Sequence, residues 1–195
     1  MWPWEHVIVG YLIYSLVCRM IFGRSPGAAE TIAVVFASIL PDLIDKPLAW
    51  QFGVFDSGYA LGHSIFFAVP LAIIVGLFAQ YRGRTDVAVA FALGYLLHLP
   101  ADVADGYFRS GMVNLDLMLW PVVSPTVAPM NQTFMRELQH HLTRYHAELT
   151  ADDPSRYLIV MVVLALTTLI LWILDGAPVL REILIIGRRK LGGQH

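Results

Sequence analysis

Long runs of apolar residues, separated by short polar stretches, dominate the chain. Five runs cover about residues 6–22, 28–44, 59–79, 87–104 and 157–174. An α-helix needs about 20 mainly apolar residues to cross the core of a bilayer, so each run is of suitable length for one span. The pattern predicts an all-α protein, a polytopic helical bundle of about five membrane spans.

Two segments between the fourth and fifth runs differ from this pattern. Residues 112–130 are apolar but interrupted by Asn114, Asp116 and three prolines, which predicts an interfacial or re-entrant segment packed against protein. Residues 131–156 are polar and compatible with a helix. We therefore expect a single transmembrane domain over 1–175 with an outer loop at 106–156, followed by a basic juxtamembrane tail at 176–195.

The composition supports a membrane location. Of the 195 residues, 57% are hydrophobic and 14% are charged, whereas a soluble domain is about half apolar and a quarter charged. This composition therefore argues against a soluble globular enzyme. The formal net charge of −2 gives no basic surface for a polyanion, so no nucleic-acid partner is expected. The single cysteine, Cys18, cannot form an internal disulfide.

Basic residues in the short loops predict the orientation of the spans. Arg24 follows the first run, Arg82 and Arg84 lie between the third and fourth, and four more basic residues follow the fifth. These positions share one side of the membrane if the spans alternate, and basic short loops are cytoplasmic. We expect a multi-pass cell-membrane protein with its N-terminus outside and its C-terminus in the cytoplasm.

Polar side chains gather at one end of the predicted bundle. Alternating spans place seven of them at the outer ends of the first four helices: His6, Asp42, Asp45, His63, His98, Asp102 and Asp105. Polar groups at membrane depth are costly, so each needs a partner or a function. The spacing of His98, Asp102 and Asp105 places these three on one helical face.

Imidazole and carboxylate groups together form a ligand set that suits Zn²⁺, with Mn²⁺ or Fe²⁺ as alternatives. Without a cation, several buried carboxylates would repel one another or be protonated. The simpler interpretation is a set of His–Asp hydrogen bonds that only tie helices together. For seven converging groups we favour a metal or proton-handling site.

Several short motifs resemble a known family. They are His6 with Gly10, the run Leu40 to Asp45, Gly62-His63-Ser64, the run Gly94 to His98 followed by Asp102, and Leu119-Trp120-Pro121. Their order over about the first 121 residues is similar to that of the YdjM-type inner-membrane proteins, membrane-bound metal-dependent hydrolases once described as LexA-binding. The resemblance implies a metal-dependent hydrolytic site, more distantly similar to that of zinc-dependent phospholipase C.

The sequence departs from the family pattern at one motif. A His-Arg-Gly run usually precedes a Thr-His-Ser motif there, whereas Gly58, Tyr59 and Ala60 occupy the first run and Gly62 replaces the threonine. A ligand or an anion-binding arginine of the family is therefore missing from this position.

If the site is hydrolytic, His63, His98, Asp102 and Asp42 are the first choices as metal ligands, and His6 and Asp45 complete one or two metal positions. Asp45 or Asp105 could take a proton from the attacking water, or orient a histidine ligand instead. Spacing alone leaves these two roles open.

The leading hypothesis is a metal-dependent hydrolase at the outer membrane interface, acting on a phosphoester of a lipid or lipid-linked substrate. A histidine about 10 Å inside a span end is accessible from the head-group layer. One alternative is a cation or proton transporter, although the inner halves of the second to fourth runs offer few polar groups beyond Glu30. Another is a non-catalytic structural or regulatory membrane protein with a residual metal site.

Overall fold

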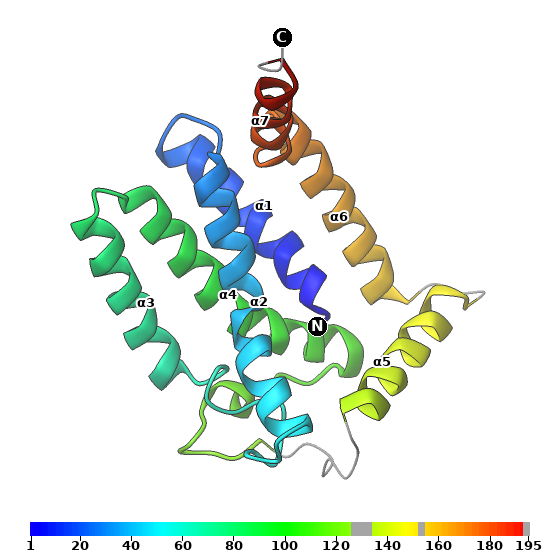
Figure 1. Cartoon of the computed structure of the whole chain (residues 1–195). Helices are drawn as coiled ribbons and strands as arrows, with labels where there is room; N and C mark the ends of the chain where they lie inside the picture. The colour runs from blue at the N-terminus through cyan, green and yellow to red at the C-terminus, as the bar shows by residue number, and fades with distance from the viewer. Residues whose placement is uncertain (126–133, 152–154, 193–195) are drawn as a thin grey trace.

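The computed structural model describes residues 1–125, 134–151 and 155–192, and within these ranges every regular element is a helix (Figure 1). The elements are α1 (Pro3–Ile21), α2 (Ala28–Trp50), α3 (Ile65–Tyr81), α4 (Thr85–Ser110), the 3₁₀ helix η1 (Leu115–Met118), α5 (Phe134–Leu149), α6 (Arg156–Leu174) and α7 (Leu180–Gly192). The predicted all-α fold is confirmed.

Three helices, α1, α4 and α6, are long and apolar enough to cross a membrane. The helix α3 is also apolar but has only 17 residues. The helix α2 has 23 residues, but it carries Glu30, Asp42, Asp45 and Lys46. The membrane character of the chain is therefore supported, while the number of five spans stays a prediction.

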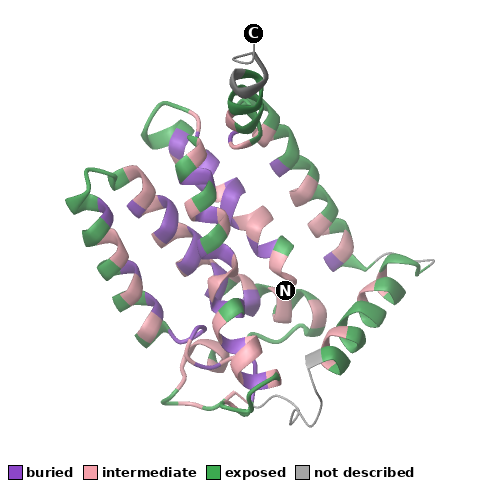
Figure 2. Cartoon of the chain, in the orientation of Figure 1, coloured by how far each residue is buried: buried purple, intermediate pink, exposed green. Residues whose placement is uncertain are grey.

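The core lies where α1, α2 and α4 pack together, and Figure 2 shows buried residues concentrated on these helices. Two glycines allow the close approach. A Cβ on Gly94 of α4 would lie 2.6 Å from the carbonyl oxygen of Val34 in α2, and a Cβ on Gly10 of α1 would lie 2.1 Å from Ser38 Oγ. Residues without a side chain at these positions let the helix backbones meet, as in other membrane bundles.

The outer helices present apolar side chains to their surroundings. In α6 only Tyr157 and Thr168 are buried, whereas most of its leucine, isoleucine and valine residues are exposed. The helix α3 buries three alanines against α4 and exposes its large side chains. Exposed apolar faces on long helices are what a lipid environment requires.

Two helices extend beyond their predicted ends. The sequence places the ends of the second and fourth spans at about 44 and 104, but α2 continues to Trp50 and α4 to Ser110. Pro41 and Pro100, which favour a helix end in the sequence, lie inside α2 and α4. A proline removes one hydrogen bond of a helix, but the helix can continue past it. The first five residues of the expected outer loop at 106–156 are therefore helical.

The predicted third span begins too early. The sequence places its start at about 59 and His63 inside it, but α3 begins at Ile65 and residues 58–64 form an irregular turn. The physical reason is Asp45, whose carboxylate accepts the N–H groups of Ala60, Gly62 and His63. These bonds hold the backbone in a turn where a helix would need the same donors for itself.

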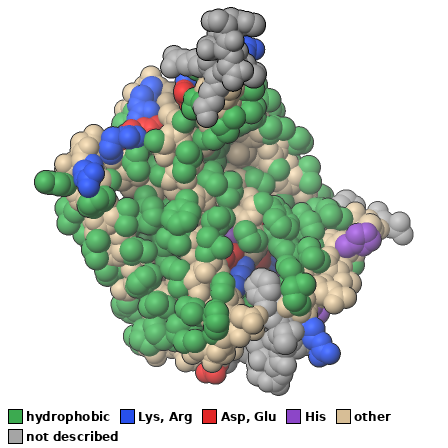
Figure 3. Space-filling model, in the orientation of Figure 1, with side chains coloured by type: hydrophobic (Ala, Val, Ile, Leu, Met, Phe, Trp, Pro, Cys, Tyr) green, Lys and Arg blue, Asp and Glu red, His purple; other side chains and the backbone are tan. Residues whose placement is uncertain are grey.

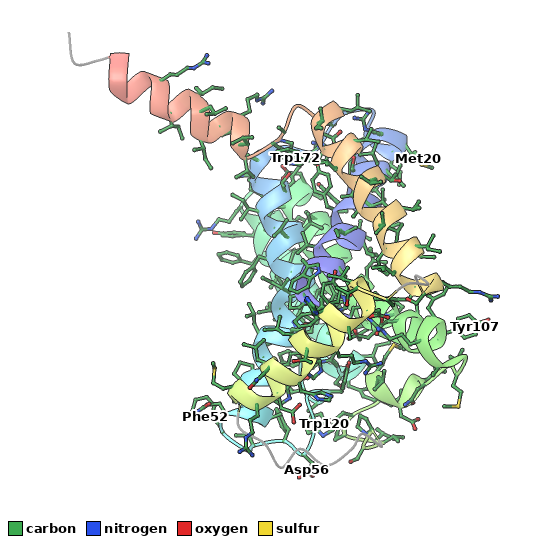
Figure 4. All side chains as sticks on the ribbon, turned by 90° about the vertical axis from the view of Figure 1, so that its right-hand side faces the viewer. Met20, Phe52, Asp56, Tyr107, Trp120 and Trp172 are labelled. Carbon is green, nitrogen blue, oxygen red and sulfur yellow. The ribbon has the colours of Figure 1, made fainter. Side chains whose placement is uncertain are left out.

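The bundle has two distinct ends, and Figure 4 shows Phe52, Asp56 and Trp120 at one and Met20 and Trp172 at the other. The first end also carries η1 and α5, while α7 extends from the second (Figure 1). Residues 112–125 of the predicted re-entrant segment contain η1 and turns, as expected for irregular backbone. Its remainder, 126–130, lies outside the described residues.

Candidate metal centre

The seven polar groups singled out in the sequence come together from four segments. His6 is in the first turns of α1, Asp42 and Asp45 are in α2, and His63 is in the turn before α3; the fourth segment, α4, supplies His98, Asp102 and Asp105. All except Asp105 are buried. The first two segments meet the fourth because the buried stripes of α1, α2 and α4 face one another.

The rings of His63 and His98 point at each other through the same atom. Their Nε2 atoms are 3.1 Å apart. On the other side of each ring, His63 Nδ1 lies 2.8 Å from Asp45 Oδ2 and His98 Nδ1 lies 2.7 Å from the carbonyl oxygen of Ser38. A carboxylate and a carbonyl only accept hydrogen bonds, so each Nδ1 carries a proton. In the neutral rings both Nε2 atoms then present lone pairs to the same point.

Two carboxylates face that point as well. Asp42 Oδ1 lies 3.4 Å from His63 Nε2 and 3.8 Å from His98 Nε2. Asp102 Oδ2 lies 3.3 Å from each of the same two nitrogens. Four atoms that share a tetrahedral Zn²⁺ at about 2.0–2.1 Å are separated by about 3.3 Å. Lone pairs and negative oxygens this close require a cation between them, either a proton or a metal ion.

His6 provides a further possible ligand. Its ring stacks on that of His98 with centroids 3.5 Å apart, and its Nε2 lies 3.3 Å from Asp102 Oδ1. Neither ring nitrogen makes a hydrogen bond to any described residue, although His6 is only 1% exposed. Buried polar atoms are rarely left without partners, so these nitrogens have unused coordination capacity. His6, His98 and Asp102 form one possible metal-binding group, and Asp42, His63 and His98 form another.

Asp45 lies behind the centre and contacts it only through His63. Its two oxygens accept three backbone N–H groups and the Nδ1–H of His63. The side chain is fully buried. These contacts match the orienting role that the sequence left open for Asp45.

Asp105 occupies the other side of the centre, one helical turn beyond Asp102. It forms an ion pair with Arg109 at 2.8 Å, and Arg109 also binds both oxygens of Glu148 in α5 at 3.0 Å. The amino group of Met1 lies 2.8 Å from Asp102 and 3.4 Å from Asp105. Asp105 is thus the partly exposed carboxylate next to the cluster.

A pocket of about 330 Å³ lies beside the cluster, between α2, α4 and α5. Asp42 and Asp105 both line it. Figure 3 shows a hollow near the centre of the view, with charged side chains at its floor and hydrophobic side chains around it. The helix α5 contributes His141, whose ring packs against Trp50 at 5.6 Å. The outer loop, through α5, therefore lies next to the site.

The sequence analysis missed two residues of this arrangement. Lys46 is one of them: it lies in α2, and its Nζ is 2.6 Å from Asp42 Oδ2. Its spacing of four residues from Asp42 was the available signal. Ser38 holds His98 through its backbone carbonyl, which leaves no signal in the sequence.

The structure explains why residue 62 is a glycine. A Cβ at this position would lie 2.7 Å from the carbonyl oxygen of Pro41, so the turn that carries His63 can approach α2 only with glycine there. The adjacent Ser64 caps α3 by accepting the N–H of Phe66, and its hydroxyl donates to the carbonyl of Trp120.

The chain matches the model of a known protein family. The family model of the YdjM inner membrane protein matches residues 1–177, which extends well past residue 121, where the recognised motifs end. No curated protein and no solved structure matches the chain. Since the matched region covers most of the sequence and contains all seven polar groups, the chain belongs to the YdjM inner membrane protein family.

Proposed function

We propose that this protein is a membrane-embedded, metal-dependent hydrolase that acts at the outer membrane interface on a phosphoester of a lipid or lipid-linked substrate. The observation that carries the proposal is the pair of Nε2 atoms 3.1 Å apart, with Asp42 and Asp102 facing them. This arrangement is chemically stable around a divalent cation. Zn²⁺ suits its nitrogen and oxygen ligands best, with Mn²⁺ or Fe²⁺ as alternatives.

The residues divide into three roles. His63, His98, Asp42 and Asp102 would hold the cation, with His6 as a further ligand, and the cation would acidify water and polarise the phosphoryl oxygen. Asp45 would keep His63 in one tautomer. Asp105 lines the pocket and is partly exposed, so it is the better placed of the two carboxylates to accept a proton from water.

Transport is less well supported. The polar groups at the other end of the bundle are engaged with one another: Arg24 binds Glu30, and Asp175 accepts from Tyr11, Ser15 and Arg19. The hydrogen bond to Glu30 raises the pKa of Arg24, so this guanidinium keeps its charge. Next to these groups, Tyr14 and Cys18 of α1 and Val34 of α2 belong to a buried apolar cluster. Zn²⁺ or proton flux in sealed vesicles that requires His63 would favour transport instead.

The test is metal content together with hydrolysis in the full chain. Protein purified without chelator should contain close to a whole number of transition-metal ions per chain, measured by elemental analysis. His98→Ala and Asp102→Asn should each lose that metal, because each removes a ligand atom from the centre. Both variants should also lose release of phosphate or head group from a panel of phospholipid and lipid-linked phosphoester substrates.

Two matched substitutions serve as controls. His146→Ala removes an exposed histidine of α5, and Asp86→Asn removes a carboxylate in the first turn of α4. Both should retain metal and activity. Metal binding and hydrolysis that persist in His98→Ala and Asp102→Asn would end the proposal.

A further inference from the structure

The pocket beside the metal centre contains a cation that the centre does not use. Lys46 is paired with Asp42, and Arg109 is paired with Asp105 and Glu148. Arg144 of α5 also lines the pocket, and it forms no ion pair with the described residues. A guanidinium group is well suited to bind a phosphate through two parallel hydrogen bonds.

The α2 wall of the pocket has an apolar strip beside Asp42 and Lys46. Ile39, Leu43 and Pro47 form it at intervals of four residues. The same face of α2 continues away from the pocket through Phe36, which is 48% exposed, and Ile32, which is 58% exposed. Residues three or four apart share one side of a helix, so these five side chains form a continuous apolar track, the α2 track.

Position and charge together indicate what kind of molecule fits. Asp42 belongs both to the pocket wall and to the metal centre, so a group bound in the pocket lies next to the centre. The cation of Arg144 complements an anionic group. The α2 track is partly exposed along α2. Such an apolar surface suits a hydrocarbon chain and would serve no purpose for a small water-soluble phosphate.

We propose that the pocket binds the phosphorylated head of an amphiphile, with Arg144 contacting the phosphate and the hydrocarbon chain lying on the α2 track. This inference rests on the proposed function for the adjacent metal centre and assigns the residues that bind the head and the hydrocarbon chain of its substrate. Specificity then comes from α2 and α5, outside the metal ligands.

The experiment measures binding of decyl phosphate to the full chain in amphipol, through the fluorescence of Trp2 and Trp50 in the pocket wall. Inorganic phosphate tests binding of the phosphate head group alone, and decyl maltoside tests binding of the hydrocarbon chain alone. Decyl phosphate should bind more tightly than either. Arg144→Gln should weaken decyl phosphate binding about tenfold, because it removes charge-assisted hydrogen bonds.

Leu43→Asn tests the part of the pocket that is proposed to bind the hydrocarbon chain. The substitution should weaken the binding of decyl phosphate about tenfold, because apolar contact with its hydrocarbon chain is lost. The binding of inorganic phosphate should stay unchanged. The matched controls are Arg136→Gln, an exposed arginine of α5 that does not line the pocket, and Leu77→Asn, an exposed leucine of α3. Both controls should bind decyl phosphate as the unmodified chain does.

Two outcomes overturn the inference: decyl phosphate binding no tighter than inorganic phosphate, or Arg144→Gln and Leu43→Asn both binding it normally. Failure of the proposed function has a different signature. The protein could hold no metal and hydrolyse nothing, yet bind decyl phosphate in a way that depends on Arg144 and Leu43. That result would support the proposed binding pocket and refute the proposed hydrolase activity.

Discussion

At the scale of single residues, the candidate site depends on which atom of each side chain is already occupied. Both histidines of the central pair use Nδ1 for a hydrogen bond to a fixed acceptor, Asp45 for His63 and Ser38 for His98. Their Nε2 atoms are thereby directed at one point. The carboxylates differ in the same way. The oxygens of Asp45 accept four hydrogen bonds, whereas Asp42 and Asp102 each direct an oxygen towards the histidines.

Asp45→Asn tests this distinction. An amide keeps the size of the side chain but presents an NH₂ donor to a site that consists of donors, so His63 should lose its fixed orientation. We expect metal affinity to fall about 10- to 100-fold, with hydrolysis restored by added metal. Titration of the metal-depleted chain, followed by activity at each metal concentration, measures both.

The contrary result is equally informative. If Asp45→Asn binds metal with unchanged affinity but hydrolyses nothing at saturating metal, Asp45 acts as the proton acceptor and Asp105 does not. The control is His146→Ala, an exposed histidine of α5, which should alter neither quantity.

At the scale of helices, the bundle is held together differently at its two ends. The site end relies on the close approach of α1, α2 and α4 and on the turn bound to Asp45. At the other end, Asp175 closes α6 and accepts from three side chains of α1: Tyr11 at 2.8 Å, Ser15 at 2.7 Å and Arg19 at 2.6 Å. This second connection fixes α6, whose remaining surface is mostly exposed.

Asp175→Ala should loosen α6 without affecting the metal centre. It leaves three donors without their common acceptor: the buried hydroxyls of Tyr11 and Ser15 and the partly exposed guanidinium of Arg19. A buried donor left without a partner costs about 1–3 kcal/mol. The free energy of unfolding, measured in mixed micelles, should fall by about that amount, while metal content stays unchanged because the centre lies at the opposite end of α1.

The comparison variant is Glu182→Ala. Glu182 forms an exposed pair with Arg181 in α7, and surface pairs contribute at most about 1 kcal/mol. An equal loss of stability in both variants, or loss of metal in Asp175→Ala, would contradict the assigned role of Asp175.

At the scale of the whole molecule, the turn between α3 and α4 joins the start of α4, whereas the metal centre uses His98 and Asp102 in the second half of that helix. The proposed orientation places the loop that contains Asp56 outside the cell and the turn that contains Arg82 in the cytoplasm. Both residues are exposed. In that orientation the candidate site would face the outer interface.

Cysteine labelling checks the orientation. In a Cys18→Ser background, Asp56→Cys should react with a membrane-impermeant maleimide in intact cells, whereas Arg82→Cys should react only after lysis. Cys18 itself is buried, so its removal should not change the pattern. Labelling of Arg82→Cys alone in intact cells would invert the orientation and place the centre towards the cytoplasm.

The sequence by itself determined the helical class, the membrane character and the set of seven polar groups, because these follow from local rules. Apolar length sets the spans, and helical spacing places His98, Asp102 and Asp105 on one face. Since intramembrane polar groups are costly, their clustering on one side already indicated a shared site. The family motifs depend on the same residues, and the family assignment is confirmed.

Only the tertiary structure decided which atoms meet. The turn at His63 exists because Asp45, 18 residues earlier, binds its backbone, and the predicted helix there was wrong for that reason. The tautomer of His98 depends on a carbonyl 60 residues away. The pairing of Lys46 and the pocket beneath α5 likewise follow from packing between helices. Such contacts between distant residues have no periodic signature in the chain, so their geometry emerges only when the helices assemble.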